Sequence, residues 1–253
     1  SAKVNGFDVA LQPDEVKKSI GYMSQQFSLY RDLSCSENLD FFAGIYGLSV
    51  SQIRKRKEEV SSLVGLGPYM ERRAGELSGG WRQRLALAAA LIHEPETIFL
   101  DEPTAGIDPV ARRALWDLLF HLSSEGKTLF VTTHYMDEAE RCDTIAYIYV
   151  SKLLLIGSPE ELKNLEAVRP IGTHRVSVAS HHPSLALAFY KSEPWVLDAT
   201  LIESEIRLLI PLAITQEEVM LRTQKAGQGV LGVRPAEPSL EDVFVFLTRR
   251  AAG

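Results

Sequence analysis

Residues 76–109 read ELSGGWRQRLALAAALIHEPETIFLDEPTAGIDP, and this stretch decides the fold. Its Ala/Leu-rich part, residues 82–93, predicts a helix, and the apolar run at residues 97–100 predicts a buried strand. Asp101 and Glu102 follow that strand directly. Acids at the carboxyl end of a buried parallel strand lie where α/β sheets bind ligands. The stretch therefore predicts a ligand site built on a sheet.

A second polar element precedes the predicted helix. Ser78, Gly79 and Gly80 stand at its entry. The first backbone N–H groups of a helix lack partners within the helix, and together with the helix dipole they favour an anion. We expect these residues to contact a phosphate, although an isolated Ser-Gly-Gly is more often an ordinary turn.

Strand-like and helix-like segments alternate through the first part of the chain, which favours a parallel α/β sheet. Strands are expected at residues 20–23 and 128–132, besides 97–100, and a buried-face pattern at 37–46 predicts a helix. After a boundary near residues 157–172, the order changes to βαββαβ with one added helix. We expect a core domain over residues 1–157, with a helical subdomain at about 27–92, and an accessory α+β domain over residues 172–253.

Composition excludes several classes of protein. The 253 residues carry a net charge of −6, which argues against a general nucleic-acid binder. Two cysteines, Cys35 and Cys142, lie far apart, so a disulfide framework or a zinc site is not expected, and both are expected to be buried thiols. The longest apolar run, residues 85–92, is far shorter than the roughly 20 residues that cross a bilayer.

Residues 76–109 resemble the nucleotide-binding subunit of an ATP-binding cassette (ABC) transporter. The resemblance implies a P-loop NTPase fold, ATP and Mg²⁺ as cofactors, and a head-to-tail dimer with a second ATP-binding subunit. It identifies Ser78, Gly79 and Gly80 as the signature motif, which clamps the phosphate that the opposite subunit holds. Ala105-Gly106-Ile107-Asp108 resembles the D-loop, which implies that Asp108 lies at the same nucleotide site.

The resemblance also assigns roles around the acids. Asp101 is similar to the Walker B aspartate, a Mg²⁺ ligand, and Glu102 to the catalytic glutamate that poises a water for attack. His134 follows the strand at 128–132, where the family has its switch histidine. Gln25 matches the glutamine that contacts the metal and the γ-phosphate, although Gln26 stands beside it.

Residues 27–49 resemble the helical segment of exporters that pair with a separate membrane subunit. This implies a peripheral place on the cytoplasmic side of the cell membrane, beside an integral-membrane permease. The candidate contacts with that subunit are Phe27, Leu29, Tyr30 and Leu33. An aromatic stripe follows in the same segment, and it belongs either to the core or to the contact surface: Phe41, Phe42 and Tyr46.

One family motif is missing from the sequence. No GxxxxGK followed by Ser or Thr occurs, so the resemblance implies a chain truncated before Ser1, inside the domain. We expect the parent protein to be an ATPase that powers export. The alternatives are a non-catalytic half-domain that donates its signature motif, or a regulatory interaction module. A soluble ABC ATPase of DNA repair or translation fits less well, because a long coiled coil and a second cassette are both missing.

Overall fold

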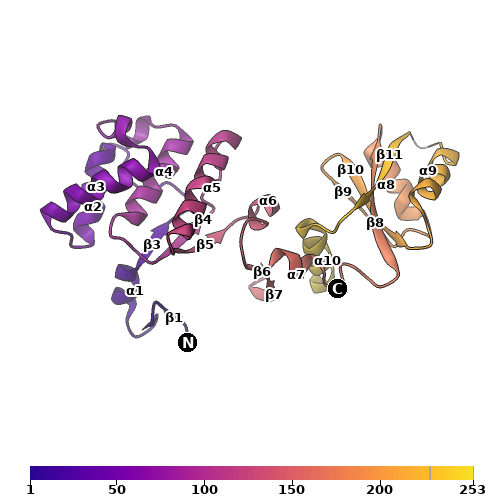
Figure 1. The fold of residues 1–253 in the computed structure, drawn as a ribbon, viewed down its shortest axis with the longest axis horizontal. Coiled ribbons are helices and arrows are strands. Elements are labelled where there is room, and N and C mark those ends of the chain that lie inside the picture. Colours follow the sequence, from indigo (N-terminus) through magenta and orange to yellow (C-terminus); the bar gives the residue numbers. More distant parts are fainter. Residues whose placement is uncertain (228, 253) are drawn as a thin grey trace. The chain divides into compact units, whose positions relative to one another are not determined.

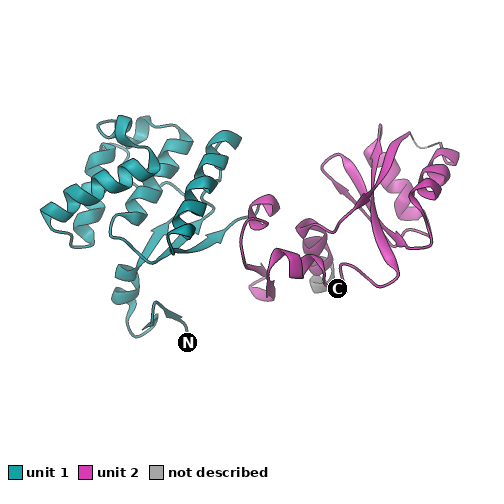
Figure 2. Cartoon of the chain, viewed as in Figure 1, with its two compact units in different colours: residues 1–134 teal, residues 135–253 magenta. Residues whose placement is uncertain are grey.

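A computed structural model describes residues 1–227 and 229–252, with the side chains of 1–227 and 229–248. The chain forms two compact units, residues 1–134 and residues 135–253, which Figure 2 colours separately. Each unit has its own sheet and its own core, so each is described by itself.

The first unit is built on a parallel sheet. Its strands are β1 (Lys3–Val4), β2 (Phe7–Asp8), β3 (Ile20–Met23), β4 (Thr97–Asp101) and β5 (Thr128–Thr132). Its helices are α1 (Pro13–Ser19), α2 (Cys35–Ile45), α3 (Val50–Val64), α4 (Gly79–Leu91) and α5 (Pro109–Ser124), with 3₁₀ turns η1 (Gly67–Tyr69) and η2 (Ala74–Glu76). Strands β3, β4 and β5 pair in parallel, as the sequence predicts, and their order in the sheet is β3-β4-β5. Strands β1 and β2 form a separate antiparallel pair.

Helix α4 lies at the centre of this unit. It contacts α2, α3, α5 and β3, and Figure 1 shows α2, α3 and α4 grouped together. Residues 85–91 are all buried, which explains why this segment is apolar on every side rather than amphipathic. Ile98 and Leu100 of β4 are also buried and add to the core.

The other face of the parallel sheet carries an aromatic row. Strand register makes Tyr22, Phe99 and Phe130 neighbours across β3, β4 and β5. Tyr22 is 57% exposed and Phe130 is 55% exposed. Parallel sheets in α/β proteins are normally covered on both faces. The described residues therefore cover one face of this sheet well and leave much of the aromatic row accessible.

The second unit contains a small antiparallel domain. Its strands are β6 (Ile145–Tyr149), β7 (Lys152–Gly157), β8 (Thr173–Ser180), β9 (Asp198–Ile202), β10 (Glu205–Pro211) and β11 (Val230–Ala236). Its helices are α6 (Met136–Ala139), α7 (Pro159–Lys163), α8 (Pro183–Ser192), α9 (Gln216–Lys225) and α10 (Leu240–Ala252). The four-stranded sheet has the order β11-β8-β10-β9, and β6 pairs with β7 in a separate hairpin. From β8 onward the element order is the predicted βαββαβ with an added helix.

The boundary between the units differs from the expected one near residue 157. Contacts divide the chain between His134 and Tyr135. The reason is a satellite core in which Leu162 and Val168 pack with Leu240 and Val243 of α10. Because partly buried side chains from residues 136–155 join this cluster, the segment after His134 belongs to the second unit.

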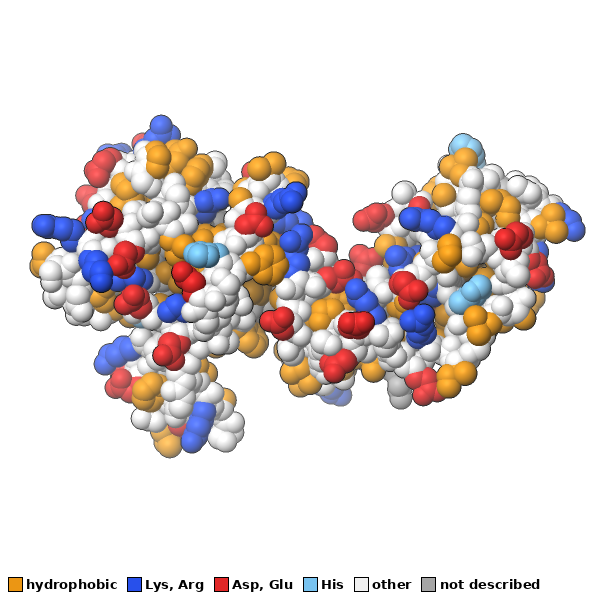
Figure 3. Space-filling view, in the orientation of Figure 1, with side chains coloured by type: hydrophobic (Ala, Val, Ile, Leu, Met, Phe, Trp, Pro, Cys, Tyr) orange, Lys and Arg blue, Asp and Glu red, His pale blue; other side chains and the backbone are white. Residues whose placement is uncertain are grey.

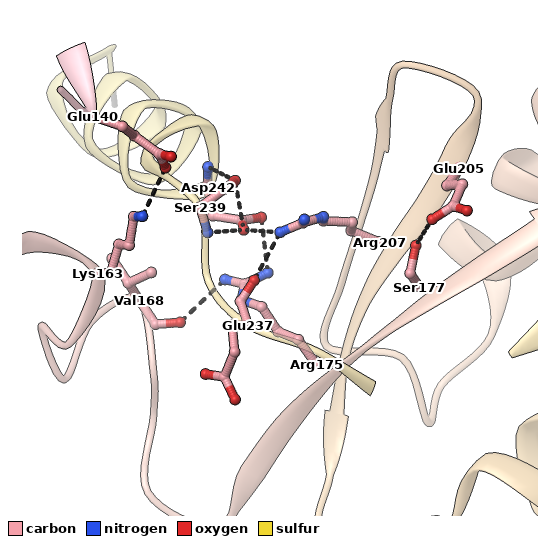
Figure 4. Close-up of polar contacts among 10 residues, drawn as sticks. All are labelled: Glu140, Lys163, Val168, Arg175, Ser177, Glu205, Arg207, Glu237, Ser239 and Asp242. Atoms are coloured by element: carbon pink, nitrogen blue, oxygen red, sulfur yellow. Dashed lines mark hydrogen bonds and ion pairs between the residues drawn. The ribbon is translucent and has the colours of Figure 1, made fainter. Parts of the chain in front are cut away.

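A buried ion-pair network fixes the start of α10 (Figure 4). The Asp242 carboxylate accepts hydrogen bonds from Arg175 at 3.2 Å and from Arg207 at 3.1 Å. It also accepts hydrogen bonds from the backbone N–H and the hydroxyl of Ser239. In return, the Ser239 hydroxyl oxygen accepts a hydrogen bond from the Asp242 N–H at 3.3 Å. Ser239 therefore caps the first turn of α10.

The surface of the chain and its two cysteines can be compared with what the sequence predicts. On the face that Figure 3 shows, basic and acidic side chains are interspersed over both units. Cys35 is a buried thiol as expected, whereas Cys142 is only half-buried. Across residues 1–227 and 229–252, no helix combines the length and apolarity that crossing a membrane requires.

Candidate active site

The two acids lie at the carboxyl edge of the parallel sheet. Asp101 is the last residue of β4, and Glu102 leaves the strand with a φ of 45°. A non-glycine residue in this left-handed region is strained, and such strain is concentrated at functional sites. The neighbouring strand holds the turn, because the Glu102 N–H donates to the Thr132 carbonyl at 3.1 Å.

Three segments that are distant in sequence meet at the Glu102 carboxylate. The Gln25 amide donates from Nε2 to Oε2 of Glu102 at 2.9 Å. Nδ1 of His134 lies 3.0 Å from the same oxygen. Gln25 follows β3 and His134 follows β5, so the three parallel strands deliver these side chains to one edge. The neighbouring Gln26 accepts a hydrogen bond from the Ser24 hydroxyl at its backbone carbonyl, and it is the Gln25 side chain that reaches Glu102.

Thr132 is a site residue that sequence reasoning missed. Its hydroxyl donates to Oδ1 of Asp101 at 2.6 Å and accepts the Glu102 N–H at 3.1 Å. The signal was available in principle, because the residue ending one parallel strand lies beside the residue ending the next. Using it requires the register of β4 with β5, in which Asp101 and Thr132 are partners.

The predicted signature residues form a second group with the D-loop. Ser78 is the N-cap of α4, but its side chain makes no capping hydrogen bond. A Cβ on Gly80 would lie 2.8 Å from the Ala111 Cβ, and one on Gly79 would lie 3.5 Å from Ile107. Glycine at position 80 thus allows α4 to approach α5 closely.

Asp108 acts locally in this second group. Its Oδ1 accepts the N–H groups of Val110 and Ala111 at 3.0 and 2.9 Å, which caps α5. The turn from Glu102 to Asp108 links the two groups, with the Ala105 N–H donating to the Glu102 carbonyl at 3.0 Å. The structure thus brings together Gln25, Asp101, Glu102 and His134, and separately the signature residues with the D-loop.

The candidate membrane-subunit contacts fall into two classes. Leu29 is 7% exposed and lines a small pocket with Tyr22, Phe42 and Tyr46, so it is an interior residue. Phe27 and Leu33 are half-buried, and Tyr30 is 48% exposed. Leu29 is therefore a poor contact residue, and the prediction is kept for the other three.

The aromatic residues predicted at 41–46 also differ from one another in exposure and packing. Phe41 is exposed and meets the Tyr30 ring edge-on at 4.7 Å, whereas Tyr46 stacks on His93 at 3.5 Å.

Sequence reasoning missed Asn38, which is fully buried and holds the whole loop. Its amide donates to the carbonyls of Tyr30, Leu33 and Ser34, and its oxygen accepts the Tyr30 N–H. A buried asparagine is expected where a loop needs several hydrogen bonds at once.

Asp101 and Glu102 lie at the carboxyl edge of the sheet, which we call the acid edge. The side chains there limit which metal ion could be bound. Within the described residues, no three His, Cys, Asp or Glu side chains form a complete metal cage. Mg²⁺ is usually held by one or two carboxylates, with water and phosphate oxygens completing its shell. Asp101 with the Gln25 amide oxygen fits such a partial site, and Glu102 beside it fits a general base.

The chain is similar to known proteins of a single family. Residues 2–105 match the family described as "ABC transporter". The "Probable multidrug ABC transporter ATP-binding protein YbhF" of Escherichia coli K12 is 43% identical over 162 residues, which are 64% of this chain and 28% of that protein. The chain thus spans less than a third of that relative's length.

A second relative matches nearly the whole chain. The "Nod factor export ATP-binding protein I" of Rhizobium sp. strain N33 is 33% identical over 248 residues, which are 98% of this chain and 78% of that protein. Among solved structures, the ATP-binding cassette MJ0796, a dimer in a post-hydrolysis state bound to ADP and Pi, superposes with a TM-score of 0.54. It is 28% identical and covers 61% of this chain and 71% of that one.

Proposed function

The chain belongs to the ABC transporter family of ATP-binding proteins, and we propose that it forms part of an ATPase that powers export through a separate membrane subunit. The observation that carries this proposal is the convergence of Gln25 and His134 on the Glu102 carboxylate. This contact is evidence beyond the sequence motifs, because the motifs do not by themselves require Gln25 and His134 to contact one oxygen of Glu102.

In the proposed reaction Glu102 is the general base. Its carboxylate would accept a proton from the water that attacks the γ-phosphate. Gln25 and His134 would leave Glu102 and contact that phosphate. Mg²⁺, when bound, would neutralise charge developing on the phosphate oxygens, and Asp101 with Gln25 would hold it.

The signature group would serve a second nucleotide site. The unused Ser78 hydroxyl and the N–H groups of Gly79 and Gly80 would clamp a phosphate held by another ATP-binding subunit in a head-to-tail dimer. Asp108 would support the same interface by fixing the start of α5. Two relatives are named as a multidrug ABC transporter protein and an export protein, and these names support the proposal of an export ATPase.

The site needs a phosphate-binding loop that residues 1–253 do not contain. We propose that polypeptide outside these residues supplies it. Without it, several charge-assisted hydrogen bonds of about 1.5–3 kcal/mol each would be missing, and ATP would bind weakly to these residues alone. The same observation favours a second candidate function, a half-domain that only donates its signature motif to another cassette.

The permease contact would lie on the helical region at the cytoplasmic membrane face. Phe27, Tyr30 and Leu33 supply apolar surface there, with Phe41 beside Tyr30. The buried Asn38 would keep this loop in one shape for the contact. The location at the membrane follows from the proposed partner.

The testing experiment is Mg²⁺-ATP hydrolysis by this chain beside its Glu102→Gln variant, with Glu125→Gln as a control on an exposed carboxylate. Turnover that is lost only in Glu102→Gln supports the ATPase. Turnover equal in all three proteins contradicts the role of Glu102. No turnover in any of them excludes catalysis by these residues alone, and the signature-donating function is then tested by adding a cassette subunit that carries its own phosphate loop, with and without Ser78→Arg.

A further inference from the structure

We infer that Thr132 is a positioning residue of the acid edge, because its single hydroxyl group joins Asp101 to Glu102. The inference rests on the proposed function, in which these two acids are the metal ligand and the base. Thr132 belongs to neither the predicted signature nor the predicted switch, and it touches no group that would react.

The hydroxyl uses both of its hydrogen-bonding abilities. As a donor it binds Oδ1 of Asp101 at 2.6 Å, and as an acceptor it receives the Glu102 N–H at 3.1 Å. A threonine hydroxyl has one donor and two acceptor lone pairs, so both bonds can exist together. Because the hydrogen can point to one oxygen only, the hydroxyl donates to Oδ1 of Asp101 alone.

The acceptor role bears on the strained residue. Glu102 has a φ of 45°, a conformation that persists only where the surroundings hold it. Its N–H is shared between the Thr132 carbonyl and the Thr132 hydroxyl, both at 3.1 Å. Losing the hydroxyl would leave one acceptor for this N–H, and the carboxylate would be less firmly directed at Gln25 and His134.

Packing does not account for threonine at this position. Thr132 is exposed at the end of β5, and a valine of the same shape would suit the strand equally well. Thr128, at the other end of the same strand and on the same face, provides a matched comparison. It is also exposed, and its backbone N–H donates to Glu96.

The experiment compares Thr132→Val, Thr132→Ser and Thr128→Val with the unchanged chain. Hydrogen exchange of the Glu102 amide, followed by NMR on the 253-residue chain, is the first readout. We expect Thr132→Val to exchange this amide about 5- to 10-fold faster, and the other two variants to match the unchanged chain. Thr132→Ala repeats the test where the valine variant folds poorly.

Steady-state ATP hydrolysis is the second readout. We expect Thr132→Val to lower kcat about 10-fold with KM for ATP changed less than about twofold, and Thr132→Ser to restore kcat. Equal kcat in the valine variant, or no rescue by serine, overturns the inference. If the unchanged chain hydrolyses no ATP, these residues alone do not catalyse, and the Glu102 amide decides: an unchanged exchange rate in Thr132→Val overturns the inference, whatever the outcome for the proposed function.

Discussion

Nδ1 of His134 and the Gln25 amide meet the same oxygen of Glu102, at 3.0 and 2.9 Å. One carboxylate oxygen thus receives two side chains from two different loops. This shared oxygen means that the three residues act as a unit, and their losses should not add.

The first prediction follows from that unit. In a protein that joins these residues to a phosphate-binding loop, His134→Ala should lower kcat for ATP hydrolysis about 10²- to 10³-fold, and combining it with Glu102→Gln should cost little more than Glu102→Gln alone. A double-mutant cycle on kcat measures this. His121→Ala, an exposed histidine on α5, is the control. Losses that multiply would show that His134 and Glu102 act independently.

The second prediction concerns the close approach of α4 to α5. Gly80→Ala would bring a new Cβ to 2.8 Å from the Ala111 Cβ, so one helix must shift. We expect unfolding in urea to show a loss of about 1–3 kcal/mol. Gly79→Ala, whose nearest neighbour would be an ordinary 3.5 Å away, is the matched control and should lose much less.

The outcome that contradicts this prediction is a Gly80→Ala protein as stable as the unchanged chain. Adding Ala111→Gly to Gly80→Ala removes the clash and should recover part of the loss. The recovery is partial because glycine within a helix is itself less favourable than alanine by about 1 kcal/mol.

Short-range patterns were sufficient to predict the strands and acids of the site. Apolar runs that end in polar residues identify β3, β4 and β5, and parallel strands deliver their end residues to one edge. These patterns place Asp101 and Glu102 at that edge, whereas Gln25 and His134 were assigned to the same site by the resemblance to the family.

Features that depend on pairing across the chain could not be predicted in this way. The Thr132 hydroxyl matters only because β5 pairs with β4 in one register. The boundary after His134 depends on Val243 of α10 packing with Leu162, which lies 81 positions earlier in the sequence. Leu29 is apolar, as a contact residue would be, and only the packing of α2 and α4 around it shows that it is an interior residue.

The third prediction tests the buried network of the second unit. Asp242→Asn keeps the shape of the side chain but leaves Arg175 and Arg207 without their carboxylate. Removing one partner of a buried ion pair costs about 3–5 kcal/mol, so this unit should unfold at lower urea concentration. Trp195 fluorescence reports on this unit once Trp81 and Trp116 are changed to Phe. Glu241→Gln, the adjacent acid, is the control, and equal losses in both variants would contradict the role of the network.

The last prediction concerns pH. His93 stacks on Tyr46 and its Nε2 lies 3.0 Å from the Ile20 carbonyl at the start of β3. Burial lowers the pKa of His93 from 6.5 to about 4. The unfolded chain therefore binds a proton between these pH values that the folded chain does not, so stability present above pH 6.5 is lost as pH falls toward 4.

Urea unfolding at pH 7.5 and pH 5 measures this loss. Because the ring is only partly buried, solvent screening reduces the effect, and we expect the unchanged chain to lose about 1 kcal/mol more than His93→Gln between the two pH values. Glutamine can still donate to the Ile20 carbonyl but cannot take up a proton in this range. The comparison therefore isolates protonation from the loss of the hydrogen bond, and an equal loss in both proteins would mean that His93 is not the group that makes the first unit acid-sensitive.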